Sequence, residues 1–403
     1  MKKIFLLLTL FLFGCDFDFQ NNNPSRIEVS PEISKRLEEI INSNPSISAE
    51  LLYQSKVKKN QLGSFHHLDI ASTGLDFTHR WEPKPKYKDQ LNNSFIAAGV
   101  AVGDIDNDGL PDVFLSRQSD GGRLYKNLGN FKFEDITLKS GIKSDEMWST
   151  GVTFADVNND GWLDIFICGF DSPNRLYINQ KASFKESAEE YGLNYKGASV
   201  VMSFSDFDLD GDLDAYLLTN RLENTGATSK AKIIKNRTKS LQVHPDSREL
   251  GYFVRPPGRM PLLINAGQYD YLYRNDNGRF VDVTVESGIG KNPYYGLSST
   301  WWDYNSDGWP DLYVANDYMG PDHLFRNEGV DSNGNIKFVD VIEDAVPYTP
   351  WFSMGSDYSD INNDGKIDFL ASDMAGSNHY RDKVSMGSMS GPDSDAWFLN
   401  FPK

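Results

Sequence analysis

The chain has 403 residues, with 40 Lys and Arg against 57 Asp and Glu, so its formal net charge is −17. Aromatic residues make up 13% of the sequence, which favours a folded acidic protein over a disordered one. This charge repels phosphate backbones and anionic lipid surfaces, so we expect no nucleic-acid partner and no membrane contact beyond an anchor. The two cysteines, Cys15 and Cys168, are too few for a disulfide framework.

Residues 1–14 have the form of an export signal. Lys2 and Lys3 precede an apolar run at 4–13 that is too short to span a bilayer as a stable helix. The run ends in Leu12-Phe13-Gly14-Cys15, which resembles the bacterial lipoprotein signal, in which the cysteine becomes lipid-modified. The sequence therefore predicts an exported lipoprotein of the cell envelope or surface, anchored through Cys15. A plain secreted protein is the alternative.

Two short segments follow the signal. Residues 15–30 are rich in Asp, Asn, Pro and Ser and predict a flexible tether. Ser30-Pro31 suits the start of a helix, and apolar residues then recur at helical spacing, so we expect a short helical segment within 31–62. Cys168 lies in an apolar run, which predicts a small buried hydrophobic residue.

One nine-residue pattern occurs five times after residue 65. Every copy has Asp or Asn at positions 1, 3, 5 and 9 and Gly at position 6. The copies, which we number loops 1 to 5, are D-I-D-N-D-G-L-P-D at 104–112, D-V-N-N-D-G-W-L-D at 156–164, D-F-D-L-D-G-D-L-D at 206–214, D-Y-N-S-D-G-W-P-D at 303–311 and D-I-N-N-D-G-K-I-D at 360–368. Their first positions are 52, 50, 97 and 57 residues apart.

Two further motifs follow the loops and explain the long third spacing. A Leu-Tyr-x-Asn element recurs at 124–127, 176–179 and 272–275, and with Phe in place of Tyr at 324–327. A Phe-x-Asp-Ile/Val-Thr element follows closely, as in 133–137 and 280–284. After loop 3 the Leu-Tyr element is delayed, so that unit carries an insertion at 221–268.

Each unit predicts four short antiparallel strands. In the first unit we expect strands at 95–102, 113–116, 123–127 and 131–137, separated by Gly-rich turns. Four such strands per roughly 50 residues, repeated along the chain, are typical of β-propeller blades. The predicted fold is therefore all-β, with residues 65–403 forming a β-propeller of four-stranded blades after the short helical segment.

The loops predict metal sites because alternate oxygens on a tight glycine turn converge on one centre, as in the first half of a calcium-binding EF-hand. An EF-hand would also need Glu at position 12, where the copies have Leu115, Ile167, Leu217, Val314 and Ala371. Oxygen ligands without His, Cys or Met select a hard cation, and a flexible loop with a backbone carbonyl favours Ca²⁺ over Mg²⁺. The sequence thus predicts about five Ca²⁺ sites.

The predicted ligands are the side chains at positions 1, 3, 5 and 9, with the carbonyl of Leu110 in loop 1. They are Asp104, Asp106, Asp108, Leu110 and Asp112; Asp156, Asn158, Asp160 and Asp164; Asp206, Asp208, Asp210 and Asp214; Asp303, Asn305, Asp307 and Asp311; and Asp360, Asn362, Asp364 and Asp368. The 17 carboxylates among them repel one another within each loop, so bound Ca²⁺ should stabilise the fold. Plain Asp/Asn/Gly turns explain one copy but not five in the same register.

On these motifs the chain resembles the FG-GAP repeats of integrin α-chains and the related bacterial VCBS repeats, whose loops have the form D-x-[DN]-x-D-G-x-x-D. The Leu-Tyr-x-Asn and Phe-x-Asp elements are similar to those of the cartilage-acidic-protein-like subfamily of secreted propellers. The resemblance implies a β-propeller with calcium on the loops of one face and recognition elsewhere on its surface.

The number of blades is left open. Residues 69–75 resemble 135–142 with one residue missing and predict an outer strand without its own blade. That strand could complete the fifth blade and close a compact ring, which would protect exposed strand edges. Alternatively, the chain is a truncated form of a propeller of about seven blades, and the resemblance favours this reading.

The insertion is the candidate ligand surface. Residues 221–268 contain nine Lys or Arg against three acidic residues, which is a charge of +6 in an acidic chain. The insertion therefore either engages an anionic glycan or protein or pairs with the acidic blades. The candidate ligand-binding residues are Tyr252, Phe253, Arg255, Arg259 and Tyr269. Six tryptophans near the loops, at 148, 162, 301, 302, 309 and 351, either stack on sugars or fill blade interfaces.

The sequence favours a binding protein over an enzyme. The six histidines have no zinc spacing, and no catalytic serine elbow, phosphate loop or dinucleotide fingerprint occurs in a suitable context. We therefore predict no catalytic residues and an extracytoplasmic binding or adhesion module for glycan or protein ligands. The alternative is a calcium-dependent polysaccharide-processing enzyme, such as a lyase, or its carbohydrate-binding accessory.

Overall fold

The computed structural model describes residues 67–79, 98–118, 121–143, 147–222, 228–235, 240–254, 261–317, 320–350, 352–362 and 364–374. Cys15, the predicted tether and the predicted helical segment lie outside these ranges. The chain divides into two compact units, one made of residues 70–358 with 369–403 and the other of residues 1–69 with 359–368. Loops 1 to 4 belong to the first unit and loop 5 to the second.

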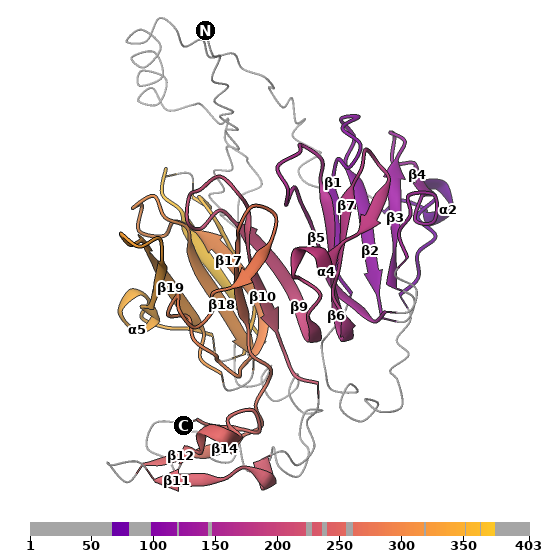
Figure 1. Ribbon diagram of the computed structural model, residues 1–403. Coiled ribbons are helices and arrows are strands. Elements are labelled where there is room, and N and C mark those ends of the chain that lie inside the picture. Colours follow the sequence, from indigo (N-terminus) through magenta and orange to yellow (C-terminus); the bar gives the residue numbers. More distant parts are fainter. Residues whose placement is uncertain are drawn as a thin grey trace, which may run out of the picture. The chain divides into compact units, whose positions relative to one another are not determined.

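The first blade is a four-stranded antiparallel sheet (Figure 1). Its strands pair in chain order: β1 (Val100–Gly103), β2 (Asp112–Arg117), β3 (Gly121–Asn127) and β4 (Phe133–Asp135). Alternate residues of β2 are fully buried, since successive side chains of a strand point to opposite faces. Strands occur at all four predicted places, but within the described residues the first and the fourth are shorter than expected.

The same order of strands recurs along the chain. The second blade contains β5 (Ser149–Ala155), β6 (Asp164–Pro173), β7 (Arg175–Asn179) and β8 (Phe184–Glu186), followed by α4 (Ala188–Tyr191). The third contains β9 (Lys196–Ser205), β10 (Asp214–Thr219), β15 (Tyr271–Asn275) and β16 (Phe280–Asp282). The fourth contains β17 (Tyr295–Trp302), β18 (Asp311–Asp317), β19 (His323–Val330) and β20 (Ile336–Asp340), followed by α5 (Ile342–Ala345).

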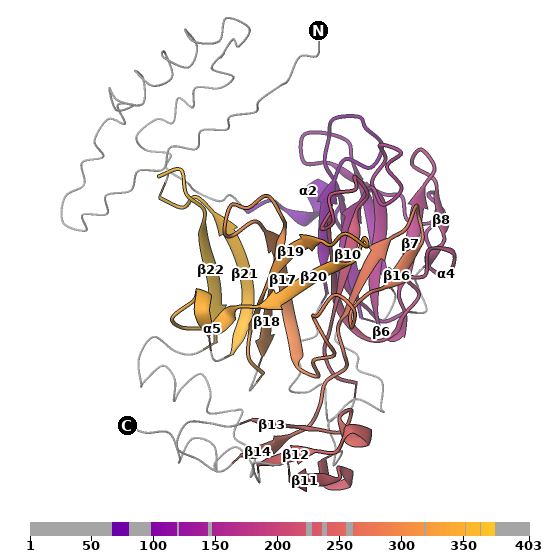
Figure 2. The ribbon, with the colours of Figure 1, turned by 60° about the vertical axis from the view of Figure 1, so that its left-hand side comes forward.

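A further pair of strands follows the fourth blade. β21 (Ser353–Ser359) and β22 (Asp368–Asp373) form a two-stranded sheet, which Figure 2 shows beside β17 and β18. Ser356 of β21 hydrogen-bonds the hydroxyls of Ser298 (2.8 Å) and Thr300 (2.7 Å) in β17. These two strands therefore occupy the same place relative to the fourth blade as the first two strands of any blade relative to its predecessor.

The insertion of the third blade folds into two hairpins between β10 and β15. Strand β11 (Ile233–Lys235) pairs with β12 (Leu241–Val243), and β13 (Tyr252–Val254) pairs with β14 (Leu262–Ile264). Two short 3-10 turns, η2 (Thr228–Lys230) and η3 (Pro245–Ser247), precede β11 and β13. The two ends of the insertion lie together, because the backbone N–H of Gln268 donates to the backbone carbonyl of Asn220 at 2.7 Å.

The hydrophobic core lies between successive blades. One cluster joins the first and second blades and includes Phe114, Leu124 and Ile165, all fully buried. Similar clusters join the second to the third blade and the third to the fourth. Cys168 is a buried free thiol in one of them, as predicted. Each blade therefore depends on its neighbour to cover its apolar face.

The junctions between blades share one backbone contact. After the outer strand of a blade, a glycine with positive φ packs against a phenylalanine carbonyl in the outer strand of the next blade. The pairs are Gly141 with Phe184, Gly192 with Phe280 and Gly288 with Phe338. A Cβ at any of these glycines would come within 2.8 Å of that carbonyl oxygen, so glycine is required there.

The segment before the first blade makes the same contact. Gly74 (φ +79°) lies against the carbonyl of Phe133, directly after the short helix α2 (Ile70–Thr73). The prediction of an outer strand at 69–75 was wrong for residues 70–73. The resemblance to 135–142 extends mainly over the turn that follows an outer strand, and such a turn curls back on itself, with the Gly74 N–H donating to the Ile70 carbonyl.

Candidate metal centres

Each of the five loops connects the first and second strands of its own sequence repeat. Loop 1 joins β1 to β2, loop 2 joins β5 to β6, loop 3 joins β9 to β10, loop 4 joins β17 to β18 and loop 5 joins β21 to β22. Position 12 of each pattern therefore falls in a strand and not in the helix of an EF-hand, as expected. The glycine at position 6 has a positive φ in every loop, between 84° and 98°.

The aspartate at position 9 anchors its loop through both carboxylate oxygens. Asp112 accepts the Ile105 N–H at 3.1 Å and the Asn127 N–H at 2.7 Å. The corresponding bonds recur at Asp164, Asp214 and Asp311 in loops 2 to 4. These four side chains are at most 1% exposed. Each oxygen keeps a second lone pair, so an anchored carboxylate could also ligate a metal ion.

Burial makes these anchoring carboxylates hard to ionise. It raises the pKa of Asp164 to about 7, of Asp214 to about 8 and of Asp311 to about 6, and the other aspartates of each loop add to this effect through their negative charge. A divalent cation beside them would favour the ionised form instead. The anchoring carboxylates are therefore groups whose ionised form a bound cation would stabilise.

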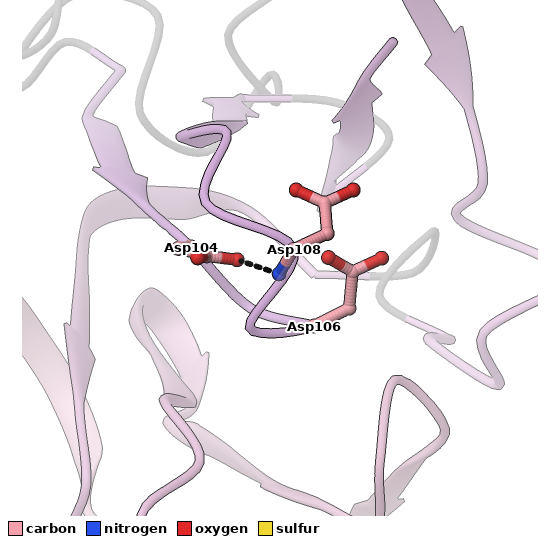
Figure 3. A group of neighbouring side chains, drawn as sticks. All are labelled: Asp104, Asp106 and Asp108. Atoms are coloured by element: carbon pink, nitrogen blue, oxygen red, sulfur yellow. Dashed lines mark hydrogen bonds between the residues drawn. The ribbon is translucent and has the colours of Figure 1, made fainter.

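The aspartate at position 1 shapes the turn. In loop 1 its carboxylate accepts the N–H groups of Asp108 (3.1 Å) and Gly109 (2.7 Å), and Figure 3 shows the Asp104 side chain turned toward the first of these. Loops 2, 4 and 5 repeat both bonds. The position-1 aspartate, a predicted metal ligand, thus holds the backbone of positions 5 and 6 in the turn.

Two groups of carboxylates converge tightly enough to hold one ion among the described residues. They are Asp104, Asp106 and Asp108 in loop 1 and Asp206, Asp208 and Asp210 in loop 3, each with carboxylate oxygens within 4.8 Å of one another. Figure 3 shows the first group. In each group one buried oxygen, Oδ1 of Asp106 or Oδ1 of Asp206, has no hydrogen-bond partner within the described part of the chain. Oxygen-only donors with an unsatisfied buried acceptor fit a hard divalent cation.

The other loops carry an asparagine at position 3. The Asn158, Asn305 and Asn362 amides each donate to the aspartate at position 5, at 2.8–3.3 Å, while their side-chain oxygens accept that residue's N–H. The amide therefore replaces one carboxylate and removes one negative charge from each of these loops. The five loops share a geometry but differ in charge.

In loop 1 a lysine side chain contacts the aspartate cluster. The Lys126 ammonium contacts Asp106 and lies 3.1 Å from Oδ2 of Asp108. Its hydrogen bond lowers the pKa of Asp108. Lys126 is the third residue of the Leu-Tyr-x-Asn element, where the second blade has Ile178 and the third and fourth have Arg274 and Arg326. Those arginines pair with Asp276 and Glu328.

The predicted ligand surface on the insertion is only partly within the described residues. Arg255 and Arg259 lie outside them. Tyr252 and Phe253 are half-buried, and the Tyr252 ring packs edge-on against Tyr294 with centroids 5.1 Å apart. Tyr269 is also half-buried, and Lys291 lies 5.9 Å from its ring centroid. Tyr252 and Tyr269 thus contribute to packing at the base of the insertion.

Most of the described tryptophans fill blade interfaces. Trp148 and Trp302 are 2% and 9% exposed, and Trp301 stacks on Phe207 with centroids 6.0 Å apart. Trp162 and Trp309, at position 7 of loops 2 and 4, are half-buried. The interior reading is confirmed for the first three. Trp351 lies outside the described residues.

Comparisons with known proteins agree with this architecture. The profile of the FG-GAP-like repeat matches residues 104–167, 156–217 and 303–371. Cartilage acidic protein 1 of Xenopus tropicalis is 26% identical over 174 residues, which cover 42% of this chain and 26% of that protein. Integrin alpha-6 of Gallus gallus is 26% identical over 170 residues, 38% of this chain and 16% of that protein. The chain spans about a quarter of the length of the cartilage acidic proteins it matches.

Among solved structures, the Vibrio cholerae biofilm matrix protein Bap1 aligns over 65% of this chain and 41% of its own, with a TM-score of 0.29 and 13% identity. The class is defined by antiparallel blades of four strands, of which the second and third are joined into one eight-stranded sheet through β6 and β9, with an acidic loop between the first two strands of each blade: it is a blade-repeat protein with candidate metal loops. The chain thus carries FG-GAP-like repeats within residues 104–217 and 303–371, and such repeats imply a β-propeller.

Proposed function

We propose that this protein is an exported β-propeller whose loops bind Ca²⁺ and whose surface binds glycan or protein ligands outside the cytoplasm. The observation that carries the metal assignment is the pair of aspartate clusters in loops 1 and 3, each with a buried oxygen that lacks a partner among the described residues. The match to FG-GAP-like repeats, and the similarity to an integrin α-chain, support a binding role.

Calcium would act on the fold itself. When bound, the ion neutralises the carboxylates that converge in each loop and gives the unpartnered oxygens a ligand. Loops 2, 4 and 5 would bind through the side-chain oxygens of their asparagines at position 3. The proposal therefore comprises five Ca²⁺ sites, one between the first two strands of each sequence repeat. Other parts of the surface would bind the glycan or protein ligand.

The proposed location follows from the amino-terminal sequence. The apolar run at 4–13 and Cys15 support export and a lipid anchor. No helix in the described ranges is long and apolar enough to cross a membrane. Incorporation of labelled palmitate into the wild-type protein, but not into Cys15→Ser, would establish the anchor.

Thermal unfolding of the full-length protein tests the metal sites. We expect the melting temperature to rise with Ca²⁺ and to fall in EDTA, because an ion that binds only the folded state stabilises it by mass action. Asp108→Ala should lower the Ca²⁺-dependent part of this shift, whereas Asp344→Ala, an exposed change in α5, should not. A melting temperature that is the same in EDTA and in 10 mM Ca²⁺ would refute the metal assignment.

Retention of acidic polysaccharides on the immobilised protein, compared with neutral ones, then tests the binding role. A binding module retains the polysaccharide unchanged. Release of unsaturated or reducing sugars during the same incubation would instead identify the protein as a polysaccharide-processing enzyme.

A further inference from the structure

Neighbouring loops are joined by asparagine side chains. In loop 1, Asn107 at position 4 donates from Nδ2 to the carbonyl of Gly161, position 6 of loop 2, at 3.2 Å. In loop 2, Asn159 at position 4 donates to the carbonyl of Gly211, position 6 of loop 3, at 2.9 Å. Asn159 also donates to Oδ1 of Asp212 at 2.7 Å. Two successive loop pairs thus carry the same bridge, from position 4 of one loop to position 6 of the next.

Both ends of each bridge lie next to predicted metal ligands. Asn107 stands between Asp106 and Asp108, and Asn159 stands between Asn158 and Asp160. At the receiving end, the Gly161 N–H donates to Asp156 at 2.8 Å. The Gly211 N–H donates in the same way to Asp206 at 3.1 Å. Each bridge thus links the backbone beside the predicted ligands of one loop to the glycine that contacts the position-1 aspartate of the next.

The series changes at loop 3. Position 4 there is Leu209, which has the same left-handed backbone as Asn107 and Asn159 (φ +59° against +58°) but no amide to donate. Its side chain is 51% exposed. The loop pairs 1–2 and 2–3 are bridged by a position-4 asparagine, whereas the pair 3–4 has no donor at this position.

A second set of bridges is common to all three pairs. The asparagine of the Leu-Tyr-x-Asn element donates to position 8 of its own loop and to position 2 of the preceding loop. Asn179 reaches Ile105 at 2.8 Å, Asn275 reaches Val157 at 3.2 Å and Asn327 reaches Phe207 at 2.8 Å. These bonds join the blades in all three pairs, whereas the position-4 bridges occur, among the described residues, in the pairs 1–2 and 2–3 and not in the pair 3–4.

We propose that loops 1, 2 and 3 bind Ca²⁺ as one cooperative array coupled through Asn107 and Asn159, while loop 4 binds outside this coupling. This inference rests on the proposed Ca²⁺ binding and adds that binding to one loop raises the Ca²⁺ affinity of the next. An ion in one loop fixes the backbone around position 4, and the bridging amide then holds position 6 of the next loop in its closed form. The next site is organised before its own ion arrives, so its affinity is higher.

The test is Ca²⁺ binding to the full-length protein in 0.15 M salt, where a Debye length of about 8 Å limits direct charge coupling between loops. Wild-type binding should have a Hill coefficient above 1. Asn159→Ser should lower the Hill coefficient, because the serine side chain is too short to bridge to loop 3. The change should leave the loop backbone intact, since Ser306 has the same left-handed conformation at position 4 of loop 4. Leu209→Ser is the matched control, since it makes the same residue at position 4 where no bridge exists.

A loop-specific readout adds a second variant. In Asp104→Ala, loop 1 loses its position-1 ligand, and we expect loop 2 to bind Ca²⁺ about fivefold more weakly through the lost coupling. Displacement of Tb³⁺, read as the part of its sensitised emission that Trp162→Phe abolishes, reports the affinity of loop 2. In Asn107→Ser, the Asp104→Ala change should no longer affect loop 2.

The possible outcomes distinguish the proposed Ca²⁺ binding from the proposed coupling between loops. Absence of Ca²⁺ binding by the wild type would refute the proposed function together with the coupling. Binding with an unchanged Hill coefficient in both Asn107→Ser and Asn159→Ser would refute the coupling alone. Equal losses of cooperativity in Asn159→Ser and Leu209→Ser would also overturn it, because the bridges would then not be the cause.

Discussion

The carboxylate at position 9 anchors its loop to the sheet and is also a proposed metal ligand. Each buried Asp of loops 1 to 4 accepts one N–H from its own loop and one from the Leu-Tyr-x-Asn strand, so it ties the loop to the third strand of the blade. A bound ion would use the remaining lone pairs of the same side chain. Loss of such a carboxylate would therefore disturb the sheet even without calcium, which distinguishes it from the exposed aspartates at position 5.

The Lys126 ammonium competes with any cation for loop 1. Lys126→Met removes that competitor and places an apolar side chain where the second blade has Ile178. An ion pair of this exposure is worth up to about 1 kcal/mol, so the Ca²⁺ affinity of loop 1 should rise about fivefold. Calorimetric titration measures the change. Lys139→Met, an exposed lysine that pairs with Glu134 in the same blade, should leave the affinity as it is.

Asp270 gives the fold a pH dependence away from the loops. Its buried carboxylate accepts the Thr219 N–H (2.7 Å) and the Tyr216 hydroxyl (2.9 Å), and burial raises its pKa from 3.8 to about 7. Between these values the folded chain keeps a proton that the unfolded chain has released. The contribution of Asp270 to folding stability is therefore lost as the pH rises through this window.

Asp270→Asn should remove that dependence. The amide keeps an oxygen for Thr219 and carries no charge, so the free energy of unfolding relative to wild type should increase from pH 4.5 to pH 7.5, on the order of 2–4 kcal/mol. Urea unfolding across this range at saturating Ca²⁺ measures it. Asp344→Asn in α5 provides the exposed control. Parallel curves for Asp270→Asn and wild type would contradict the assignment.

At the scale of the element, the sequence predicted most of what the structure contains. The strands and turns follow from local alternation and from glycines, and the loops from ligand spacing within nine residues. The Leu-Tyr-x-Asn element was recognised as a strand marker, but the task of its asparagine was not. Asn275 and Asn327 bond to residues 118 and 120 positions away, and such pairings become visible only once the blades are side by side.

We expect the asparagine of each Leu-Tyr-x-Asn element to contribute strongly to the folding stability. Asn275→Ala deprives the carbonyls of Val157 and Leu213 of their donor in a buried setting, at a cost of about 1–3 kcal/mol. We expect a lower melting temperature with and without Ca²⁺. Asn335→Ala, in the exposed turn between β19 and β20, should change the stability by no more than about 0.5 kcal/mol.

At the scale of the whole molecule, the insertion is a separable part. The chain leaves the third blade at Asn220 and returns at Gln268, and these residues are hydrogen-bonded to each other. In the other blades the second and third strands are joined by short connections, as between β2 and β3. Strands β10 and β15 therefore do not need the intervening residues in order to pair.

Replacement of residues 223–264 by Gly-Ser-Gly should consequently preserve the fold. We expect the Ca²⁺-dependent rise in melting temperature to persist, because none of the loops is touched, and retention of anionic ligands to be lost with the basic residues. Parallel melting and polysaccharide-retention measurements on this variant decide the role of the insertion. Full retention by the variant would move the ligand surface to the blades.

The glycine contact at each blade junction has a consequence for how such a chain can change over time. Gly74, Gly141, Gly192 and Gly288 dock onto a carbonyl, so this contact depends on the main chain and not on a particular side chain. The first three blades each receive a glycine at their outer strand and supply one to the next blade, and the fourth receives one at Phe338. A blade that is duplicated or exchanged by recombination would therefore keep this contact, and its fit to a new neighbour would depend on the apolar side chains between them.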